Sequence, residues 1–289
     1  MKLPIPPKEL EPYLEKARGK FVTLVMMCYD HFEFEFDSCV LEMEQECRKH
    51  GIVIYKYRTR CTDVEKGRHD AVRKGFFGDY LFFLDSDQIC PADTLVRLME
   101  HDAPIVGTLV TTKYPPHMVV TGLGSQDEGF RPILDWPKNA LIEVDATGFG
   151  CCLIKREVFE KFPDGNPFLK VYCKGLGDNY GEDWSFCIRA REHGFPIYVD
   201  TSIPVGHKGS YIYTIGDYEL YRDRVVVCEE GKPYYYACTH PKLIKRLEKH
   251  GKMDNILVMG DPSATNGQVT VIKPKPQIIS RMDLMGAQY

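Results

Sequence analysis

The sequence predicts an α/β protein with a doubly wound, mostly parallel sheet flanked by helices, followed by a C-terminal extension. Apolar runs of strand length alternate with helix-length segments over residues 21–110. The 289 residues are 44% hydrophobic and 27% charged, which is typical of a soluble globular chain. No apolar run approaches the ~20 residues that are needed to cross a bilayer. Together these observations favour one large α/β domain.

The first half of the chain carries the clearest alternation. Strands are expected at 21–28, 52–55, 80–84 and 105–110, where the apolar residues are continuous. Helices are expected between them, at 37–50, 62–75 and 92–101. Asp37 or Ser38 can cap the first helix, and Thr62 and Glu65 have the spacing of a capping box for the second. This order of elements predicts parallel strands with crossover helices.

The second half is less regular. Residues 111–140 and 163–180 hold many glycines, prolines and polar residues and are expected to be loops, the first with room for a hairpin. Further strands are expected at 141–145, 151–154 and 197–200, and helices at 156–162 and 181–194. Beyond residue 220 the sequence predicts only a short basic helix at 241–250 and a strand-like piece at 269–272.

Charge divides the chain into an acidic body and a basic end. Residues 221–289 carry 11 Lys+Arg and 7 Asp+Glu, a net +4, which leaves −8 for residues 1–220. We therefore expect an N-terminal arm at 1–20, a main domain at 21–220 and a basic extension at 221–289. Such an extension is compatible with an anionic partner, although an ordinary solvated surface has the same composition.

Eleven cysteines are scattered without a Cys-x-x-Cys pair. Several, such as Cys28 and Cys187, lie inside apolar segments and are expected to be small buried hydrophobic residues. The pattern indicates reduced thiols in a cytoplasmic compartment, with no structural zinc. The N-terminal residues have no apolar core of a secretory signal.

The most informative stretch is the strand at 80–84 together with the residues that follow it. Asp85 and Asp87 come directly after five apolar residues, and in an extended segment residues two apart point the same way. Two carboxylates so close repel each other unless a cation lies between them, and a divalent cation with oxygen ligands is a common solution. The pair therefore predicts a ligand site at the carboxyl edge of the sheet, where open α/β sheets bind ligands.

Two kinds of phosphate-binding loop are absent. No Gly-x-Gly-x-x-Gly follows the first strand, and no Gly-Lys-Ser or Gly-Lys-Thr loop occurs. A bound phosphate would thus be held by a metal ion, arginine or lysine. Gly148 and Gly150 flank Phe149 and indicate a backbone that approaches another group closely. Glu182 and Asp183 begin a helix, where acidic residues also suit the helix dipole.

Taken in order, several of these residues resemble one enzyme family. Asp85-Ser86-Asp87 is followed by Gly148-Phe149-Gly150, then by Glu182-Asp183-Trp184, and finally by Gly206-His207. This order over residues 20–215 resembles the GT-A glycosyltransferases, particularly the family-two-like enzymes that are common in phages and bacteria. The resemblance implies a GT-A fold for residues 21–220, a nucleotide-sugar donor, with UDP as the expected nucleotide, and Mn²⁺ or Mg²⁺.

The resemblance also implies roles for individual residues. Metal ligation is implied for Asp85, Asp87 and His207, and the role of catalytic base for Asp183. Contacts with the donor or the acceptor are implied for a larger set, namely Tyr29, Asp30, Arg68, Asp85, Ser86, Asp87, Gly148, Phe149, Glu182 and Trp184. The family often has an asparagine after the arginine that matches Arg68, whereas this chain has His69.

The chemistry of these residue types agrees with glycosyl transfer. A metal ion can neutralise a departing nucleoside diphosphate, and a carboxylate can take the proton of an acceptor hydroxyl. Because Asp183 is available as a base, we expect inversion at the anomeric carbon. The acceptor is open between a hydroxymethylated phage DNA, a glycan, a lipid-linked sugar and a protein side chain.

Two other classes share part of the pattern. The haloacid-dehalogenase-type phosphatases also have a strand that ends in Asp-x-Asp, but they place it on the first strand, whereas here it follows the third. A non-catalytic nucleotide-sugar-binding module could have the same fold, although the full set of Asp85, Asp87, Asp183 and His207 favours an enzyme.

Overall fold

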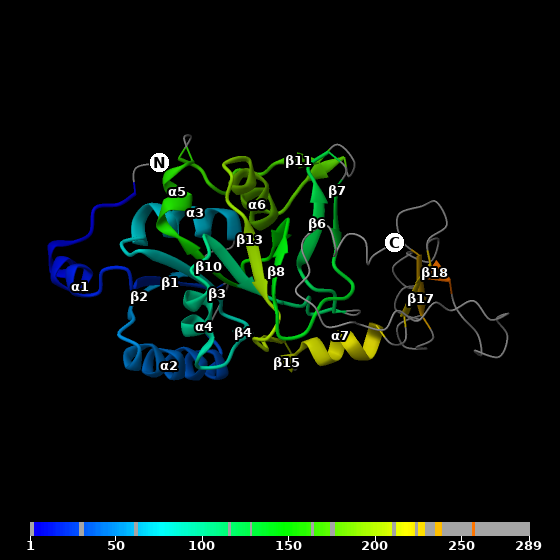
Figure 1. The fold of residues 1–289 in the computed structure, drawn as a ribbon, viewed down its shortest axis with the longest axis horizontal. Coiled ribbons are helices and arrows are strands. Elements are labelled where there is room, and N and C mark those ends of the chain that lie inside the picture. The colour runs from blue at the N-terminus through cyan, green and yellow to red at the C-terminus, as the bar shows by residue number, and fades with distance from the viewer. Residues whose placement is uncertain are drawn as a thin grey trace.

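The structure is a computed structural model. Figure 1 shows its helices and strands, coloured along the chain. The structure describes residues 3–28, 32–60, 63–114, 117–127, 129–162, 165–173, 177–209 and 212–222, and short strands at 225–228, 235–238 and 256–257. The helix predicted at 241–250 and the strand-like piece predicted at 269–272 lie outside these residues, as do Tyr29, Asp30 and Thr62.

A seven-stranded sheet forms the centre of the molecule. Its order is β2 (Val53–Arg60), β1 (Phe21–Cys28), β3 (Tyr80–Asp85), β10 (Cys151–Lys155), β5 (Ile105–Thr108), β13 (Ile197–Asp200) and β8 (Leu141–Val144). The strands β2, β1, β3, β5 and β13 share one direction, whereas β10 and β8 are antiparallel to their neighbours. The predicted doubly wound, mostly parallel α/β architecture is therefore confirmed.

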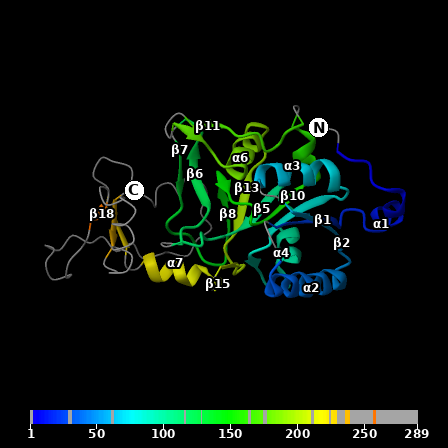
Figure 2. The same cartoon turned by 180° about the vertical axis from the view of Figure 1, so that it is seen from behind.

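Helices cover both faces of this sheet. Figures 1 and 2 show α3 (Val64–Gly75), α5 (Arg156–Glu160) and α6 (Glu182–Glu192) over one face, and α2 (Phe34–Lys49) and α4 (Thr94–Glu100) over the other. A short arm, with the 3-10 turn Lys8–Leu10 and α1 (Glu11–Lys16), precedes β1. The helices on each face of the central sheet pack against it through a separate apolar core.

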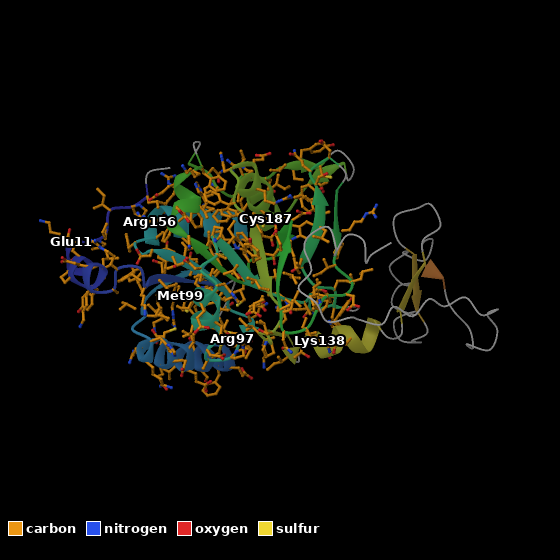
Figure 3. All side chains as sticks on the ribbon, in the orientation of Figure 1. Glu11, Arg97, Met99, Lys138, Arg156 and Cys187 are labelled. Atoms are coloured by element: carbon orange, nitrogen blue, oxygen red, sulfur yellow. The ribbon has the colours of Figure 1, made fainter. Side chains whose placement is uncertain are left out.

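The alternation of side chains along the strands divides the two cores. On β3, Leu81 and Phe83 face the α3–α6 side, and Phe82 and Leu84 face the α2–α4 side. Cys187 lies in the first core, and Figure 3 shows it within the body of the fold. The eight cysteines among the described residues from 3 to 222 are buried and free, as predicted for Cys28 and Cys187.

Some predicted boundaries hold and others shift, as at the strand predicted at 105–110, which ends at Thr108. The strands at 21–28 and 197–200 have the predicted limits. The second strand, however, continues through polar residues to Arg60, because β1 pairs with it along its whole length. The first helix begins at Phe34 rather than at Asp37 or Ser38. The second is capped by Asp63, whose side chain accepts a hydrogen bond from the Lys66 backbone nitrogen at 3.3 Å.

Two of the smaller sheets bear on the position of the site. A three-stranded sheet joins β6 (Thr121–Ser125), β7 (Gly129–Pro132) and β9 (Ala146–Thr147), and contains the hairpin for which the loop at 111–140 had room. The other joins β4 (Gln88–Ile89), β14 (Gly206–Lys208) and β15 (Ile212–Tyr213). Since β4 directly follows Asp87, this sheet brings β14 to the end of β3.

The remaining elements complete the description. They are β11 (Tyr172–Cys173), β12 (Asp178–Asn179), α7 (Ile215–Arg222), β16 (Val225–Cys228), β17 (Tyr235–Cys238) and β18 (Ile256–Leu257). Helix α7 crosses the predicted domain boundary at 220, and its Tyr218 is buried against Trp136 with ring centroids 5.3 Å apart. Among the helices of the described residues, none has the length and apolar character of a membrane span.

Candidate active site

Side chains from four separate elements meet where β3 ends. Asp85 is the last residue of β3, and Asp87 lies in the turn that follows. Helix α3 contributes Arg68, the N-terminus of α6 contributes Glu182 and Asp183, and β14 contributes His207. Residue pairs far apart in sequence are therefore adjacent in space, as the sequence predicted for a site at this edge of the sheet.

Arg68 is the centre of a buried ionic cluster. Only 3% of its side chain is exposed, and its Nη1 lies 2.7 Å from Glu182 Oε1. Its Nη2 lies 3.4 Å from both carboxylate oxygens of Asp85. Burial raises the pKa of Asp85, and the positive charge of Arg68 opposes this rise. The guanidinium thus joins α3, β3 and α6 at the site.

Phe149 packs against the Arg68 guanidinium, and the glycines on either side of it lie close to neighbouring parts of the chain. Phe149 is fully buried and stacks on Phe83 with ring centroids 5.6 Å apart. The guanidinium carbon of Arg68 lies 5.3 Å from the centre of the Phe149 ring, as in a cation–π contact. A Cβ atom at Gly148 would lie 3.0 Å from the Val120 side chain, and one at Gly150 would lie 3.3 Å from Gln88. The close approach expected at these glycines is therefore made to the protein's own chain.

Asp183 has the environment of a proton acceptor. Burial, followed by the negative charge of Glu182, raises the pKa of Asp183 to about 6. Arg68 opposes the rise, and the Trp184 backbone nitrogen donates to Asp183 Oδ1 at 2.8 Å. A carboxylate whose pKa lies near neutrality holds a proton more readily than an ordinary aspartate while remaining largely ionised at pH 7. This is the protonation behaviour of a general base.

Asp87 lies between two basic side chains. Lys113 Nζ is 2.6 Å from Asp87 Oδ2, and His207 Nε2 is 3.4 Å from Asp87 Oδ1. Burial raises the pKa of Asp87, but the hydrogen bonds and charges of His207 and Lys113 outweigh it and lower the pKa to about 2. Asp87 is consequently ionised throughout the physiological range and available to a cation.

His207 is oriented as a metal ligand would be. Its Nδ1 lies 2.5 Å from the carbonyl oxygen of Thr111, and since that oxygen can only accept, Nδ1 carries the proton. The protonated ring donates from Nε2 to Asp87 and lowers the pKa of that carboxyl, whereas in the neutral ring Nε2 has a free electron pair directed at the same carboxylate. Two electron-pair donors that face each other need a proton or a cation between them. Metal-binding histidines are commonly fixed through a backbone carbonyl in this way.

Asp87 and His207 bring one carboxylate and one imidazole to the same point of the site. Within the described residues, no group of three or more His, Cys, Asp and Glu side chains is arranged to hold a metal ion. Asp85, the third predicted ligand, pairs with Arg68. Mg²⁺ in proteins is often held by one or two carboxylates together with substrate phosphates and water. The two side chains therefore fit a divalent cation only where water or substrate oxygens complete its coordination.

Trp184 and Ser86 lie at the margin of the site. Trp184 packs against Phe130 and Tyr180, with ring centroids 5.3 and 6.3 Å away, and its buried Nε1 has no hydrogen-bond partner among the described residues. The Ser86 backbone nitrogen donates to the Met27 carbonyl oxygen at 3.1 Å, which ties the residue between the two aspartates to β1. Tyr29 and Asp30, predicted at the nucleobase, lie outside the described residues.

Sequence reasoning did not identify Lys113 or the carbonyl of Thr111. Both belong to the loop between β5 and β6, which has no motif, and Lys113 is one of 37 lysine and arginine residues in the chain. The proximity of Lys113 to Asp87, 26 residues away in sequence, depends on the path of that loop. Only the basic charge in a loop at the carboxyl edge could have drawn attention to it.

Comparison with known proteins finds structural similarity alone. No protein-family model matches the chain, and no curated protein matches it. The structure of A197 from STIV aligns with a TM-score of 0.43 and 19% identity, over 65% of this chain and 85% of that chain. The structure of GalNAc-T7 with UDP, GalNAc and Mn²⁺ aligns with a TM-score of 0.43 and 13% identity, over 65% of this chain and 43% of that chain. At such distance the alignments do not assign an activity, so the functional argument is built on the site.

Proposed function

We propose that this chain is a metal-dependent glycosyltransferase, which moves a sugar from a nucleotide-sugar donor to an acceptor hydroxyl. The observation that carries the proposal is the arrangement of His207 and Asp87. The Thr111 carbonyl fixes the ring so that Nε2 faces the carboxylate 3.4 Å away, an arrangement that either a proton or a shared cation between the two groups satisfies. A separate carboxylate with a raised pKa, Asp183, begins the neighbouring helix α6. A cation site and a distinct base are what glycosyl transfer from a diphosphate needs.

On the donor side, Asp87 and His207 would hold Mn²⁺ or Mg²⁺. The ion supplies positive charge to the diphosphate as it leaves. Arg68 is neutralised by Asp85 and Glu182, so its part is to keep these two carboxylates in place at the donor. Tyr29 and Asp30 would contact the nucleobase, Ser86 and the Gly148–Phe149 backbone would border the donor, and UDP is the nucleotide that we expect.

On the acceptor side, Asp183 takes the proton of the attacking hydroxyl. The acceptor oxygen forms a bond to the anomeric carbon while the bond from that carbon to the diphosphate breaks, so the configuration inverts. Glu182 keeps the base poised, because its negative charge contributes to the raised pKa of Asp183. Trp184 borders the sugar or the acceptor, since aromatic side chains with a polar edge suit amphipathic ligands.

The basic extension is the feature of the chain that bears on the acceptor class. The net charge of +4 on residues 221–289 suits a polyanion such as hydroxymethylated phage DNA, and a glycan or lipid-linked sugar is the alternative. Association with DNA should weaken steeply with salt, because released counterions dominate such binding. An acceptor bound equally well at low and high salt would favour the glycan.

The test of the proposed function is the release of UDP from UDP-sugars in the presence of Mn²⁺. We expect release by the wild type that is abolished by removal of the metal and by Asp87→Ala. Release of inorganic phosphate from an aryl phosphate would instead identify a phosphatase. Failure to turn over any nucleotide sugar, with binding retained, would identify a binding module.

Activity is expected to rise with pH through about 6. Asp183 must be ionised to accept a proton, and its pKa is raised to about 6, so kcat/KM falls below that pH. In Glu182→Gln the neighbouring negative charge is lost and Arg68 is less neutralised, and both changes lower the pKa of Asp183. The acidic limb of the profile of kcat/KM against pH should therefore move to lower pH. A limb that stays in place or moves upward would contradict the assignment of Asp183 as the base.

A further inference from the structure

Lys113 occupies the side of Asp87 that faces away from His207. Its Nζ is 2.6 Å from Oδ2, while His207 Nε2 and Gln88 Nε2 are each 3.4 Å from Oδ1. The ammonium group therefore makes the shortest of these three contacts with the carboxylate. The side chains of Lys113 and Asp87 are 34% and 32% exposed. Partly exposed ion pairs contribute little to stability, so this pair can be exchanged for another partner.

The loop between β5 and β6 carries Lys113 and, through the Thr111 carbonyl, contacts the ring of His207 on β14. The loop is closed by a bridge between Thr111 and Val119, and the Thr112 nitrogen donates to the Met118 carbonyl oxygen at 2.9 Å. The Thr111 carbonyl fixes the ring of His207. The loop is also attached to the small sheet, because the ring of His117 stacks on Tyr213 of β15 with centroids 4.6 Å apart. Lys113 is thus held at Asp87 by an anchored loop.

A divalent cation at Asp87 would change the partner of Lys113. The ammonium group and the ion carry like charges and would share one carboxylate, so they repel each other. The diphosphate that completes the coordination of the ion brings new negative charge to the same place. Lysine is a common phosphate ligand, since its compact charge sits on a flexible stem.

We propose that Lys113 is a diphosphate ligand of the donor, held on Asp87 until a divalent cation displaces it. The inference rests on the proposed function for the identity of the diphosphate. In this arrangement Lys113 and the cation compete for the Asp87 carboxylate, whereas both of them bind the diphosphate. Removing the lysine charge therefore has opposite effects on the two ligands.

The test measures both ligands by calorimetric titration of the full chain, using the wild type, Lys113→Gln and Lys113→Arg. We expect Lys113→Gln to bind Mn²⁺ alone about threefold to tenfold more tightly, because no ammonium competes for Asp87. With saturating Mn²⁺, the same variant should bind UDP about tenfold more weakly, because one charge-assisted contact is lost. Lys113→Arg keeps the positive charge, so its affinities for Mn²⁺ and for UDP should stay near those of the wild type.

The control is Lys138→Gln, which removes another lysine of an ion pair, 2.8 Å from Glu219. Lys138 is labelled in Figure 3. The Lys138→Gln variant should bind Mn²⁺ and UDP with the affinities of the wild type. Mn²⁺ binding that is unchanged or weaker in Lys113→Gln, or equal UDP binding by wild type and Lys113→Gln, would overturn the proposal. A wild type that binds Mn²⁺ but no UDP would overturn the role at the diphosphate and the proposed donor together, while tighter Mn²⁺ binding by Lys113→Gln would still establish the competition.

Discussion

Replacement of Asp183 by asparagine is expected to lower kcat for sugar transfer by about 10²–10⁴-fold, the usual contribution of a general base. The amide is close in size to the carboxylate, so the start of helix α6 should be preserved, but it cannot accept the proton of the acceptor hydroxyl. The affinity for the donor should change little, because the proposed cation ligands are Asp87 and His207. Initial rates under saturating donor and Mn²⁺ measure the effect.

A matched control is available in the strand that precedes α6. Asp178 is exposed on β12, and Asp178→Asn should leave kcat unchanged. If Asp183→Asn retained more than about a tenth of the activity, the base would be another group, because a loss below the usual range does not fit direct proton transfer. A loss confined to donor affinity would likewise contradict the assignment.

Replacement of Arg68 by alanine is expected to cost about 3–5 kcal/mol of the free energy of unfolding. The guanidinium is 3% exposed and is the cationic partner of both Glu182 and Asp85, so its removal leaves two carboxylates without that charge. The packing of the guanidinium over Phe83 and Phe149 is lost as well. Urea unfolding at pH 7 measures the difference.

Arg73 supplies the control for Arg68, since it lies on the same helix with an exposed side chain. Arg73→Ala should change the free energy of unfolding by no more than about 0.5 kcal/mol. A cost below about 1 kcal/mol for Arg68→Ala would show that the carboxylates find other compensation, which the described contacts do not provide. Loss of binding to the donor should accompany the loss of stability, because Arg68 holds Asp85 and Glu182 in place.

The central sheet could be predicted where burial left a continuous apolar run. β1 and β13 are such runs, and their predicted limits were correct. The direction of β10 could not be predicted in this way. Its residues, Cys151 to Lys155, form an apolar run like that of a parallel strand, yet the strand is antiparallel between β3 and β5. Direction is set by the path of the preceding loop, which composition does not encode.

The candidate site likewise has a part that the sequence predicts and a part that depends on tertiary structure. The sequence placed Asp85 and Asp87 at the edge of the sheet, and the structure brings Arg68, Glu182 and His207 to them. A shared ligand for both aspartates was expected from the alternation along a strand. β3 ends at Asp85, however, so Asp87 lies in a turn, and each carboxylate has its own basic partners. Contacts across long loops, such as that of Lys113, depend on tertiary structure alone.

The most direct test of the account is thermal unfolding of the wild type and Asp87→Ala with a panel of nucleotide sugars, with and without Mn²⁺. A ligand that binds only the folded state raises stability by ~2.7 kcal/mol at a hundredfold excess over Kd. We predict an increase in Tm for one nucleotide class that requires Mn²⁺ and is absent from Asp87→Ala. An unchanged Tm for every nucleotide sugar, or an increase that persists in Asp87→Ala or without metal, would contradict a cation-dependent donor site at Asp87.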